Sequence, residues 1–557
     1  MKLKQVVKDI FIILNSSEKR KLCWLAVADV CISVLDIVFL MALLLLINFY
    51  TQPAGTVAAS KIAWLPVQTH PALLISFFFL LFSVKNMAGF FISKRQYRFV
   101  YAVASRISCK NLAQYLDGSY MDYVNIDSAV VNRRISQEPI EFAHYVLNGV
   151  QQIFSQLVLV LVTSIAVFAF NPLLFPLLIL LLAPPVFLAT YLMKRKLDEA
   201  RTEGKRTSEK TLQHLQEALA GFVEGNIYKK NDYFIRRYHR LQEQLNHYLS
   251  DRLIIQNLPP RLIEVFAVFG LLVLVLLQFF TANGQAIPLV TIGALMVAAY
   301  KIIPGIVKVT NITGQVKTYS FASAGLAANA GLPQRNKLNA GSVEGIRFEN
   351  VGFNYPGKNT IGSLSFSIEK GDFTVIAAVS GKGKTTLINL LLGFLQPASG
   401  RICVNGVQTD AALRQHCWPS IAYIKQQPFF VHASIIENIA LQENGYDPGK
   451  IKHVTTLTGI DAFAESFPQG LETIITENGK NFSGGQRQRI SFARALYRDF
   501  DLLILDEPFN ELDEAAELQM LETLKNIAAA GKMVVLVTHN STAFSFCNKK
   551  ILLDECA

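Results

Sequence analysis

Long apolar stretches, interrupted by polar ones, dominate residues 1–310. A helix needs about 20 mostly apolar residues to cross a bilayer. The pairs Asn171-Pro172 and Asn283-Gly284 favour turns, so each separates two spans that would otherwise join. The pattern therefore predicts six membrane-spanning helices, at residues 22–48, 71–93, 153–170, 173–193, 262–280 and 286–309.

Two polar connections, residues 94–152 and 194–261, are much longer than loops need to be. They are rich in Lys, Arg, Glu and Gln and largely free of Pro, which favours helices that extend into the cytoplasm. We expect the first to turn at Asp117-Gly118-Ser119-Tyr120, and the second at Gly225-Asn226 and Lys230-Asn231-Asp232. Such helical hairpins are suited to transmit motion from a cytoplasmic domain.

The pattern changes after residue 318. Ala, Gly, Asn, Ser and Pro dominate residues 319–342, which is typical of a linker. In residues 343–557 short strands and helices alternate, and the apolar runs suit strands buried on both faces of a parallel sheet. These runs are Phe373–Val379, Leu502–Leu505 and Met533–Val537. The sequence predicts an α-helical transmembrane domain in residues 1–318, with six long helices and cytoplasmic extensions, followed by an α/β domain in residues 343–557.

Composition and charge place this chain in a membrane. Hydrophobic residues make up 51% and charged residues 17%, which excludes an ordinary soluble protein. The net charge is +11, but basic clusters such as Lys19-Arg20-Lys21 flank the spans, whereas the loop Thr51–His70 carries only Lys61. By the positive-inside rule, the N-terminus and the α/β domain are cytoplasmic, and we expect a bacterial inner (plasma) membrane rather than a nucleic-acid partner. The apolar run Leu22–Ile47 exceeds a signal-peptide core, so it is expected to remain uncleaved.

A glycine-rich loop follows the first apolar strand. The spacing from Ala378 to Thr385 matches G-x-x-x-x-G-K-[ST] except at its first position. The backbone of such a loop wraps the β-phosphate, Lys384 reaches the β and γ oxygens, and the Thr385 hydroxyl holds Mg²⁺. The α/β domain is therefore predicted to be a P-loop NTPase nucleotide-binding domain, with a helix over Leu387–Phe394. The expected nucleotide-binding residues are Ser380, Gly381, Lys382, Gly383, Lys384, Thr385 and Thr386.

Two acids and a histidine complete the expected catalytic site. Asp506 ends an apolar strand, where its carboxylate would reach Mg²⁺ through water, and Glu507 is the natural general base for an attacking water. His539, directly after Met533–Thr538, would hydrogen-bond the γ-phosphate. Alone these residues would suit ordinary loops, and only the P-loop upstream makes them a predicted site.

A second phosphate cradle lies further along the chain. Ser483-Gly484-Gly485-Gln486 opens a predicted helix that runs through Tyr497, and backbone N–H groups at a helix start attract phosphate oxygens. A chain with one P-loop has no evident use for a second cradle.

These residues together resemble the ATP-binding cassette transporters, specifically the exporter-type half-transporters with six spans and one cassette. The resemblance covers essentially the whole chain. Its motifs are Phe482–Gln486 for the signature L-S-G-G-Q, Gln426 for the Q-loop, Asn510–Asp513 for the D-loop and Tyr355 for the aromatic that stacks on adenine.

The resemblance explains the second cradle. In this family the signature of one cassette covers the ATP bound by the P-loop of another. It implies that Ser483, Gly484, Gly485, Gln486 and Asp513 serve ATP on a partner, and that Gln426 reaches Mg²⁺ beside Thr385 and Asp506. Both halves of each composite site are intact, which favours a homodimer over pairing with a different half-transporter.

Three departures from the family pattern carry expectations. Ala378 replaces a glycine, which would alter nucleotide affinity. Phe482 replaces leucine, which would change packing behind the signature. The chain ends at Ala557, soon after His539, and we expect weaker contacts between nucleotide-free cassettes.

The expected activity is ATP hydrolysis coupled to export or flipping of an amphipathic substrate by alternating access in a dimer. A peptide, a lipid-linked glycan and another hydrophobic molecule all remain open as substrate. Two alternatives also remain: an importer on the exporter fold, and a non-transporting regulatory membrane ATPase.

Ionisable residues inside spans are candidates for lining the substrate path. Asp29 and Asp36 lie seven apart on one face of the first span, and Lys85 lies at about the depth of Asp29, which predicts an Asp29 to Lys85 pair unless Asp29 faces water. Lys301 and Lys308 would form a basic stripe that favours an anionic cargo, and Glu264 is a further candidate.

Overall fold

The computed structural model divides into two compact units. The helical unit comprises Met1–Gly118 and Asn125–Gln334, and the α/β unit comprises Ser119–Val124 and Arg335–Ala557. The structure describes residues 3–51, 71–118, 120, 124, 126–170, 184, 187–188, 191, 203–204, 206–281, 289–330, 341–355, 358–377, 383–476 and 479–553.

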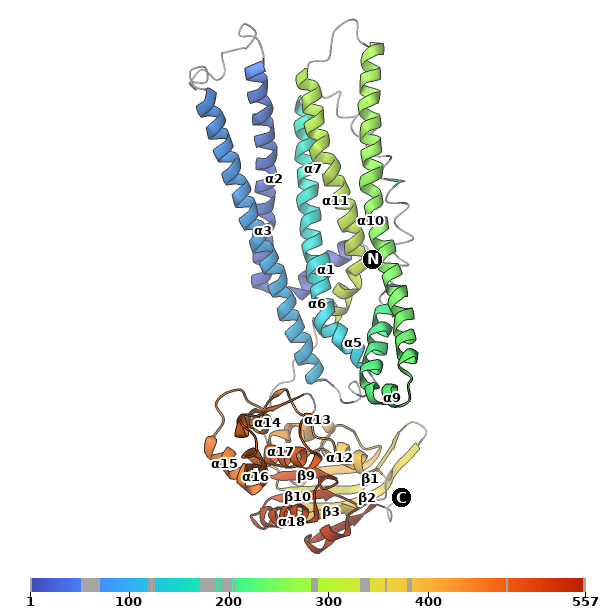
Figure 1. Ribbon diagram of the computed structural model, residues 1–557, viewed down its shortest axis with the longest axis vertical. Helices are drawn as coiled ribbons and strands as arrows, with labels where there is room; N and C mark the ends of the chain where they lie inside the picture. The colour runs from blue at the N-terminus through green and yellow to red at the C-terminus, as the bar shows by residue number, and fades with distance from the viewer. Residues whose placement is uncertain are drawn as a thin grey trace. The chain divides into compact units, whose positions relative to one another are not determined.

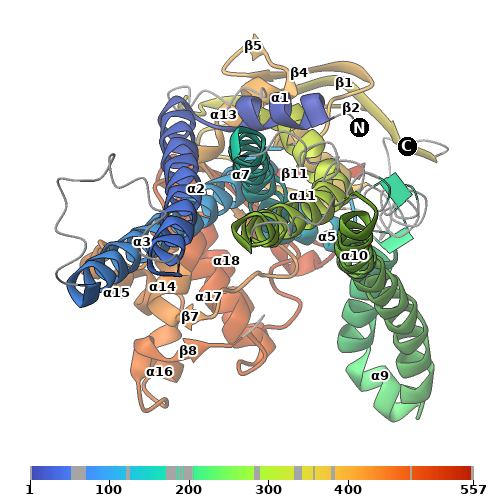
Figure 2. The same ribbon diagram turned by 90° about the horizontal axis from the view of Figure 1, so that it is seen from above.

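Long helices dominate the helical unit. Figure 1 shows α2, α3, α7, α10 and α11 running lengthwise, and Figure 2 shows the short α1 lying crosswise to them. Residues 206–220 are also helical, and two segments are π-helices, namely η1 (Arg133–Gln137) and η2 (Phe142–Leu147). The α-helices are α1 (Leu3–Ile13), α2 (Ser16–Thr51), α3 (Pro71–Leu116), α5 (Ser128–Asn132), α6 (Glu138–Glu141), α7 (Asn148–Phe170), α9 (Phe222–Ile227), α10 (Asn231–Thr281) and α11 (Leu289–Ala330).

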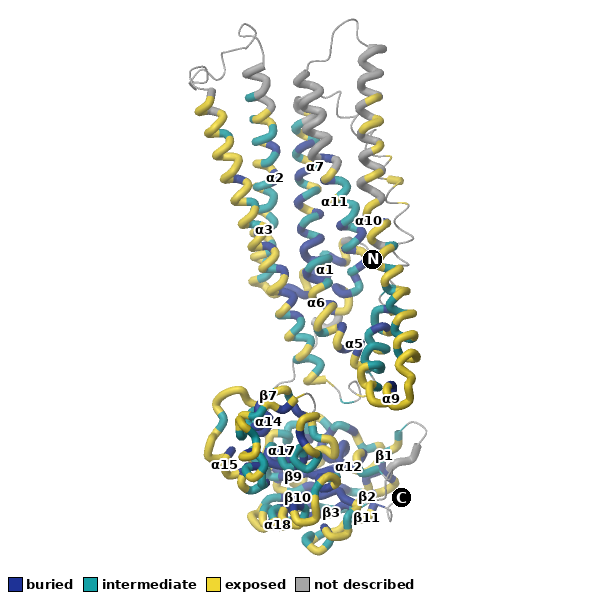
Figure 3. The backbone as a smooth tube through the Cα atoms, viewed as in Figure 1, coloured by how far each residue is buried: buried dark blue, intermediate teal, exposed yellow. Residues whose placement is uncertain are grey.

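Three stretches among the described residues are long and apolar enough to cross a membrane. They are Ser16–Leu43, Ile75–Leu116 and Ser128–Ala166. Figure 3 shows much of α3 as exposed, and its outward side chains include Phe77, Phe79 and Phe90. The predicted span at 173–193 lies almost entirely outside the described residues, and those at 262–280 and 286–309 fall largely within α10 and α11.

The predicted linker at 319–342 is partly wrong, because α11 continues to Ala330. Ser320, Ala322 and Ser323 are fully buried in the core of the helical unit, where Tyr319 stacks on Tyr145 with ring centroids 4.0 Å apart. Small side chains allow a helix to approach its neighbours closely, and the serine hydroxyls bond to carbonyl groups of their own helix. A composition typical of a linker therefore belongs here to a packed helix.

The break predicted at Gly225-Asn226 followed by Lys230-Asn231-Asp232 is present, although its first pair still belongs to a helix. Gly225-Asn226 lies inside the short helix α9, where the Asn226 amide donates to the Phe222 carbonyl at 2.7 Å. The chain turns after α9 instead, with Lys229 at φ 52°, and α10 begins at Asn231 as the second predicted turn requires. In the first connection, α3 ends at Leu116, immediately before the predicted turn.

The α/β unit contains a parallel sheet and an antiparallel sheet. The parallel sheet has the order β11-β3-β10-β9-β6, and the antiparallel sheet has the order β2-β1-β4-β5. The short strands β7 and β8 pair separately. The strands are β1 (Gly345–Tyr355), β2 (Lys358–Glu369), β3 (Phe373–Ala377), β4 (Ser399–Val404), β5 (Val407–Gln408), β6 (Ile421–Ile424), β7 (Ala433–Ser434), β8 (Ile474–Ile475), β9 (Leu502–Asp506), β10 (Met533–Val537) and β11 (Lys549–Leu552).

Helices of the α/β unit connect and cover these strands (Figure 1). The helices are α12 (Lys384–Leu391), α13 (Ala411–His416), α14 (Ile435–Ala440), α15 (Pro448–Leu457), α16 (Ile460–Ala464), α17 (Gly484–Tyr497) and α18 (Glu514–Ala529), with 3-10 turns η3 (Trp418–Ser420), η4 (Gly470–Glu472) and η6 (Ser541–Ser545).

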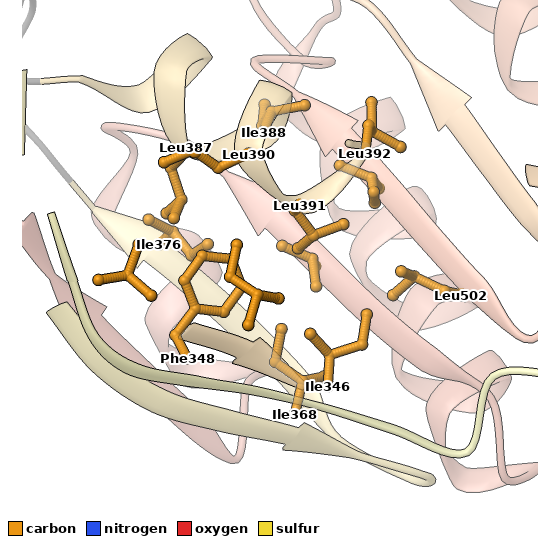
Figure 4. Close-up of a cluster of buried hydrophobic side chains, with 14 of the residues drawn as sticks. Ile346, Phe348, Ile368, Ile376, Leu387, Ile388, Leu390, Leu391, Leu392 and Leu502 are labelled. Atoms are coloured by element: carbon orange, nitrogen blue, oxygen red, sulfur yellow. The ribbon is translucent and has the colours of Figure 1, made fainter. Parts of the chain in front are cut away.

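The predicted parallel sheet is confirmed. Every residue of β9 and β10 is buried, as their uninterrupted apolar sequences indicate. Figure 4 shows side chains of α12, among them Leu387 and Leu391, meeting Phe348 and Ile376 from the two sheets. The helix predicted over Leu387–Phe394 begins earlier, at Lys384, and ends earlier, because Gly393 has φ 73°.

A segment from between α3 and α5 belongs to the α/β unit. The ring of Tyr120 lies 4.8 Å from that of Phe394, and the Asn389 amide donates to the Tyr120 hydroxyl at 3.4 Å. Phe394 in turn lies 5.1 Å from Trp418. The α/β unit thus includes a side chain that precedes its first strand by more than two hundred residues.

Candidate functional site

The carboxyl ends of three parallel strands form the candidate site. In the register of the sheet, Val537 at the end of β10 pairs with Ile376 of β3 and with Asp506 of β9. The residues that follow these strands therefore meet at one edge, which is where ligands bind in open α/β sheets.

The start of α12 provides the described part of the P-loop. Gly383 has φ 89°, a conformation that glycine adopts without strain, and Lys384 is the first residue of the helix. Thr385 is exposed and Thr386 is buried. The other five residues of the motif, 378–382, lie outside the described residues, among them the predicted Ser380, Gly381 and Lys382 and the departing Ala378.

Glu507 is the meeting point of the site. Lys384 Nζ donates to Glu507 Oε1 in an ion pair, and Gln426 Nε2 donates to Glu507 Oε2 at 2.9 Å. His539 Nδ1 lies 3.7 Å from Glu507 Oε1. The structure thus brings together the predicted catalytic residues Glu507, Gln426 and His539 with the P-loop lysine.

Asn510 is a contact that the sequence did not single out. Its Nδ2 donates to Glu507 Oε2 at 3.1 Å. The sequence did offer one signal: Asn510 has an amide side chain, follows the predicted base by three residues and begins the D-loop motif.

The backbone at Glu507 holds the carboxylate in place. Glu507 has φ 46°, which costs a residue other than glycine on the order of 1–3 kcal/mol, and its N–H donates to the Val537 carbonyl at 2.9 Å. A turn that follows the strand directly therefore directs this side chain toward Lys384.

The two acids have opposite electrostatic environments. Burial, and next the charge of Glu507, raise the pKa of Asp506 from 3.8 to about 6, although Lys384 opposes this. Burial alone would raise the pKa of Glu507 as well, but hydrogen bonds from Lys384 and Asn510 and the charges of Lys384 and His539 hold it below its ordinary value. Glu507 is therefore ionised at neutral pH, whereas Asp506, with a pKa of about 6, binds a proton only slightly below neutral pH.

Several oxygen atoms at the site have no partner within the described part of the chain. The Asp506 carboxylate is only 8% exposed yet accepts no hydrogen bond there, and neither Thr385 Oγ1 nor Gln426 Oε1 makes one. Carboxylate, hydroxyl and amide oxygens are the ligands that hard divalent cations prefer. This donor set suits such a cation, and a positive charge beside Asp506 would offset the cost of its burial.

The predicted second cradle lies at the N-terminus of α17, which Ser483 caps. Ser483 Oγ accepts a hydrogen bond from the Gln486 N–H at 3.3 Å, and the Ser483 N–H donates to Gln486 Oε1 at 2.9 Å, which forms a capping box. Ser483 is exposed, and Gly484 and Gly485 are half-buried. Gln486 thus serves the helix start itself in this structure.

Phe482 lies behind the cradle. It is buried, and its ring meets that of Phe467 edge-on with centroids 5.3 Å apart and that of Phe463 at 6.5 Å. The aromatic residue in place of leucine is therefore part of an apolar cluster and not of the exposed surface.

The D-loop lies against the cradle. A Cβ atom at Gly484 would come within 1.6 Å of Glu511 Oε2, and Arg487 Nη2 lies 3.2 Å from the same oxygen. Asp513 caps α18, because its Oδ1 accepts a hydrogen bond from the Ala516 N–H at 2.7 Å. The close approach of Glu511 to Gly484 was not predicted, since it depends on how two distant loops are placed.

The cradle and the P-loop do not meet within the described part of this chain. No hydrogen bond or ion pair there joins Ser483 or Gly485 to Lys384 or Glu507. Phe482 belongs to one apolar cluster of the α/β unit and Leu387 to another. Tyr355, the predicted adenine partner, ends β1 half-buried and lies edge-on to Phe353 with ring centroids 5.0 Å apart.

The predicted Asp29 to Lys85 pair is wrong. Lys85 is nearly buried and donates instead to Asp36, while its ammonium lies 4.8 Å from the centre of the Phe82 ring. The prediction estimated the depth of Lys85 from the ends of the apolar stretches. Because α3 continues to Leu116 as one helix, that estimate misplaced Lys85 relative to the aspartates of α2. The side chains of Glu264 and Lys301 lie outside the described part of the structure.

Comparisons with known proteins match both units. Residues 361–510 match the family model described as ABC transporter, and residues 143–299 match that described as ABC transporter transmembrane region.

Similar curated proteins are bacterial transport proteins. A probable ABC transporter ATP-binding/permease protein of Haemophilus influenzae is 35% identical over 213 residues, 38% of each chain. The glutathione/L-cysteine transport system protein CydD of Bacillus subtilis is 28% identical over 298 residues, 52% of this chain and 51% of the relative. An ATP-dependent lipid A-core flippase of Xylella fastidiosa is 25% identical over 553 residues, 97% of this chain and 91% of the relative. The chain thus spans about half or less of the Haemophilus influenzae and Bacillus subtilis relatives, and nearly all of the Xylella fastidiosa relative.

A solved structure supports the fold. A bacterial Atm1-family ABC exporter with ATP bound superposes with a TM-score of 0.74 at 17% identity, covering 96% of this chain and 94% of the other.

Proposed function

This chain belongs to the ABC transporter superfamily, with the organisation of an exporter-type half-transporter, and we propose that it hydrolyses ATP to export or flip an amphipathic substrate. The observation that carries this is the grouping of Lys384, Gln426, Asn510 and His539 around Glu507, in a chain whose other unit holds helices able to span a membrane. We assign the membrane domain to residues 1–330 and the nucleotide-binding domain to residues 343–557.

Nucleotide binding would change the partner of Lys384. The ammonium group leaves Glu507 for the β- and γ-phosphate oxygens, which frees Glu507 to accept a proton from the attacking water. His539 donates a hydrogen bond to the γ-phosphate and is then placed to register its release.

We assign Mg²⁺ to Thr385, Gln426 and Asp506, whose oxygen atoms lack partners within the described residues. When bound, the ion would neutralise charge on the phosphate oxygens. Gln426 would then contact the ion through its amide oxygen and Glu507 through its amide nitrogen, so one side chain would connect the ion to the general base.

The Glu507→Gln variant tests the catalytic assignment. The amide cannot accept the proton, so steady-state ATP hydrolysis should fall at least about 100-fold while ATP remains trapped on the protein. Glu522→Gln, an exposed change on α18, is the matched control and should hydrolyse ATP normally. Unchanged turnover in Glu507→Gln would remove Glu507 from this role.

We infer a homodimer in which Ser483, Gly484 and Gly485 of one chain, with Asp513 and Gln486 supporting the local structure, serve ATP bound at Lys384 of the other. Tyr355 is assigned to the adenine ring. A partner is also indicated by exposed apolar side chains on α9, where Phe222 is 71% and Ile227 is 69% exposed. Large apolar side chains grouped at one end of a helical hairpin suit a protein contact.

We place the protein in a bacterial inner membrane with the N-terminus and the α/β unit in the cytoplasm. The named activity of the Xylella fastidiosa relative, flipping of a lipid, supports an amphipathic substrate.

A further inference from the structure

Two adjoining cavities lie within the helical unit. One, of about 500 Å³, is lined by residues of α2, α3, α7 and α11, and the other, of about 580 Å³, by residues of α3, η2, α7 and α11. They share Tyr97, Gln152, Pro304 and Lys308 in their linings, and together they are called the polar cavity below. Cavities of this size are typical of small-molecule sites.

The walls of the polar cavity are fixed by hydrogen bonds between helices. Gln96 Nε2 donates to Asn148 Oδ1 at 2.9 Å, and the hydroxyl oxygens of Ser33 and Ser155 lie 3.4 Å apart. All four side chains are buried. Satisfied buried polar pairs hold their helices in one arrangement, so this wall is preorganised.

Two opposite charges in the wall have no partner within the described residues. Of the two aspartates, Asp36 is neutralised by Lys85, which leaves the carboxylate of half-buried Asp29 without a hydrogen bond or ion pair there. Lys308 on α11 likewise has none, yet it lines the same cavity as Asp29. The lining of this cavity therefore contains one negative group, Asp29, and one positive group, Lys308, that are not neutralised by described residues.

Uncharged polar groups in the lining also lack hydrogen-bond partners within the described residues. Asn311 Oδ1 is buried without a hydrogen-bond partner, and it lines the larger cavity. The amides of Gln152 and Gln156 line the smaller cavity and make no hydrogen bond among the described residues. Polar groups in a membrane domain are costly unless something satisfies them.

We propose that the polar cavity binds a zwitterion, with its ammonium group at Asp29 and its anionic group at Lys308. An apolar ligand would leave both charges unpaired, an anion alone would be repelled by Asp29, and a cation alone by Lys308. The zwitterion is either a free amino acid or short peptide, or the headgroup of a zwitterionic lipid. This inference rests on the proposed transport function and specifies the polar part of its substrate, in place of the anionic cargo expected from Lys301 and Lys308.

The first arm of the test uses the dipeptide alanyl-alanine as a probe on the full-length protein in nanodiscs without nucleotide. Calorimetry compares it with its N-acetylated form, which lacks the ammonium group, and its C-terminal amide, which lacks the carboxylate. We expect the zwitterion to bind at least tenfold more tightly than either blocked form. A tenfold loss is the minimum expected for removing one charge-assisted contact.

The variants Asp29→Asn and Lys308→Gln assign each end of the probe. Asp29→Asn should weaken the dipeptide about tenfold but leave the N-acetylated form unchanged, and Lys308→Gln should do the same with respect to the amide. Asp232→Asn and Lys525→Gln, the same substitutions outside the cavity, are the controls and should change neither. The blocked probes on the unaltered protein keep the test decisive if a variant fails to fold.

The second arm distinguishes a lipid headgroup from a free solute. ATP hydrolysis is measured in nanodiscs of phosphatidylethanolamine and of phosphatidylglycerol. Stimulation by the zwitterionic lipid alone, abolished by Asp29→Asn and by Lys308→Gln, identifies the headgroup as the source.

The inference is overturned if the zwitterionic and blocked probes bind alike and neither lipid nor variant has an effect, since the cavity is then a water-filled vestibule. Failure of the proposed function has a different signature: no ATP hydrolysis in any lipid. Hydrolysis without a response to zwitterions rejects only the present inference.

Discussion

Glu507 takes its partners from four separate segments of the chain: α12, the loop after β6, the D-loop and the loop after β10. The sequence placed three of these residues in the site: the P-loop spacing identified Lys384, a strand end identified His539, and the resemblance to the transporter family added Gln426. Asn510 escaped prediction, since its contact depends on the path of a turn. The same limit applies to Lys85, which the sequence paired with the wrong aspartate.

The Asn510→Ala substitution should shift the pH dependence of catalysis. The hydrogen bond from Asn510 helps to lower the pKa of Glu507, so its loss raises that pKa. The base must be ionised to act, and the acidic limb of kcat/KM should therefore move to higher pH, with kcat reduced several-fold. Asn526→Ala, on the exposed face of α18, should leave the profile in place. An acidic limb that does not move would show that Asn510 has no electrostatic effect on the base.

The Asp506→Asn substitution should stabilise the nucleotide-free protein while abolishing ATP hydrolysis. Because the pKa of Asp506 is raised to about 6, the folded form binds a proton between pH 4 and pH 6 that the unfolded form does not. Stability from this group therefore falls as pH rises through that window, by roughly 2–3 kcal/mol. Asparagine carries no charge and removes the loss.

Thermal unfolding in a chelating buffer measures this effect. The melting temperature of Asp506→Asn should exceed that of the unaltered protein at pH 7.5, and the difference should shrink toward pH 4.5. Glu507, whose pKa is lowered, contributes in the opposite direction as pH falls. A difference that is independent of pH would contradict the electrostatic explanation.

At the scale of elements, apolar runs predicted the strands well because a strand buried on both faces has a nearly uniform sequence. The end of α11 was missed for a related reason: buried Ala and Ser resemble a linker in composition, and only the neighbouring helices show that they are packed. The π-helical segments η1 and η2 left no pattern in the sequence either. Arg133, the first residue of η1, lies over the ring of Phe321 at 5.5 Å, a contact that joins residues nearly two hundred positions apart.

The contact between the D-loop and α17 gives a prediction at this scale. Gly484→Ala would place a methyl group against Glu511 and displace it from Arg487, at a cost of about 1–3 kcal/mol. Adding Glu511→Gly should restore at least half of the lost melting temperature, because it removes the clashing atoms. Gly325→Ala, which meets no atom within 4 Å, is the matched control. Failure of the second change to rescue the first would place the strain elsewhere.

At the scale of the whole molecule, six apolar spans followed by one P-loop indicated half of a transporter. The sequence identified both parts of a nucleotide site but could not show them meeting, because within the described residues of one chain they do not. The polar cavity was likewise out of reach, since its lining comes from helices far apart in the sequence.

Complementation between two inactive variants tests the composite site. Lys384→Ala removes the phosphate-binding lysine, and Ser483→Asp retains a helix cap while repelling phosphate. Each homodimer has two defective sites, whereas a mixed dimer, purified through two different tags, has one intact site. It should hydrolyse ATP at roughly half the normal rate at most, and clearly above either variant alone. Inactive mixed dimers would indicate that each chain completes its own site.

The position of Tyr120 has a consequence for synthesis. Tyr120 and Asn389, which are hydrogen-bonded, are 269 residues apart, so at roughly 5–20 residues per second the tyrosine leaves the ribosome tens of seconds before the helix that receives it. The aromatic contact with Phe394 is therefore among the late events of biogenesis, after most of the helical unit has been translated. A ribosome stalled before α12 would leave Tyr120 open to protease, which makes this one side chain a reporter of completed assembly.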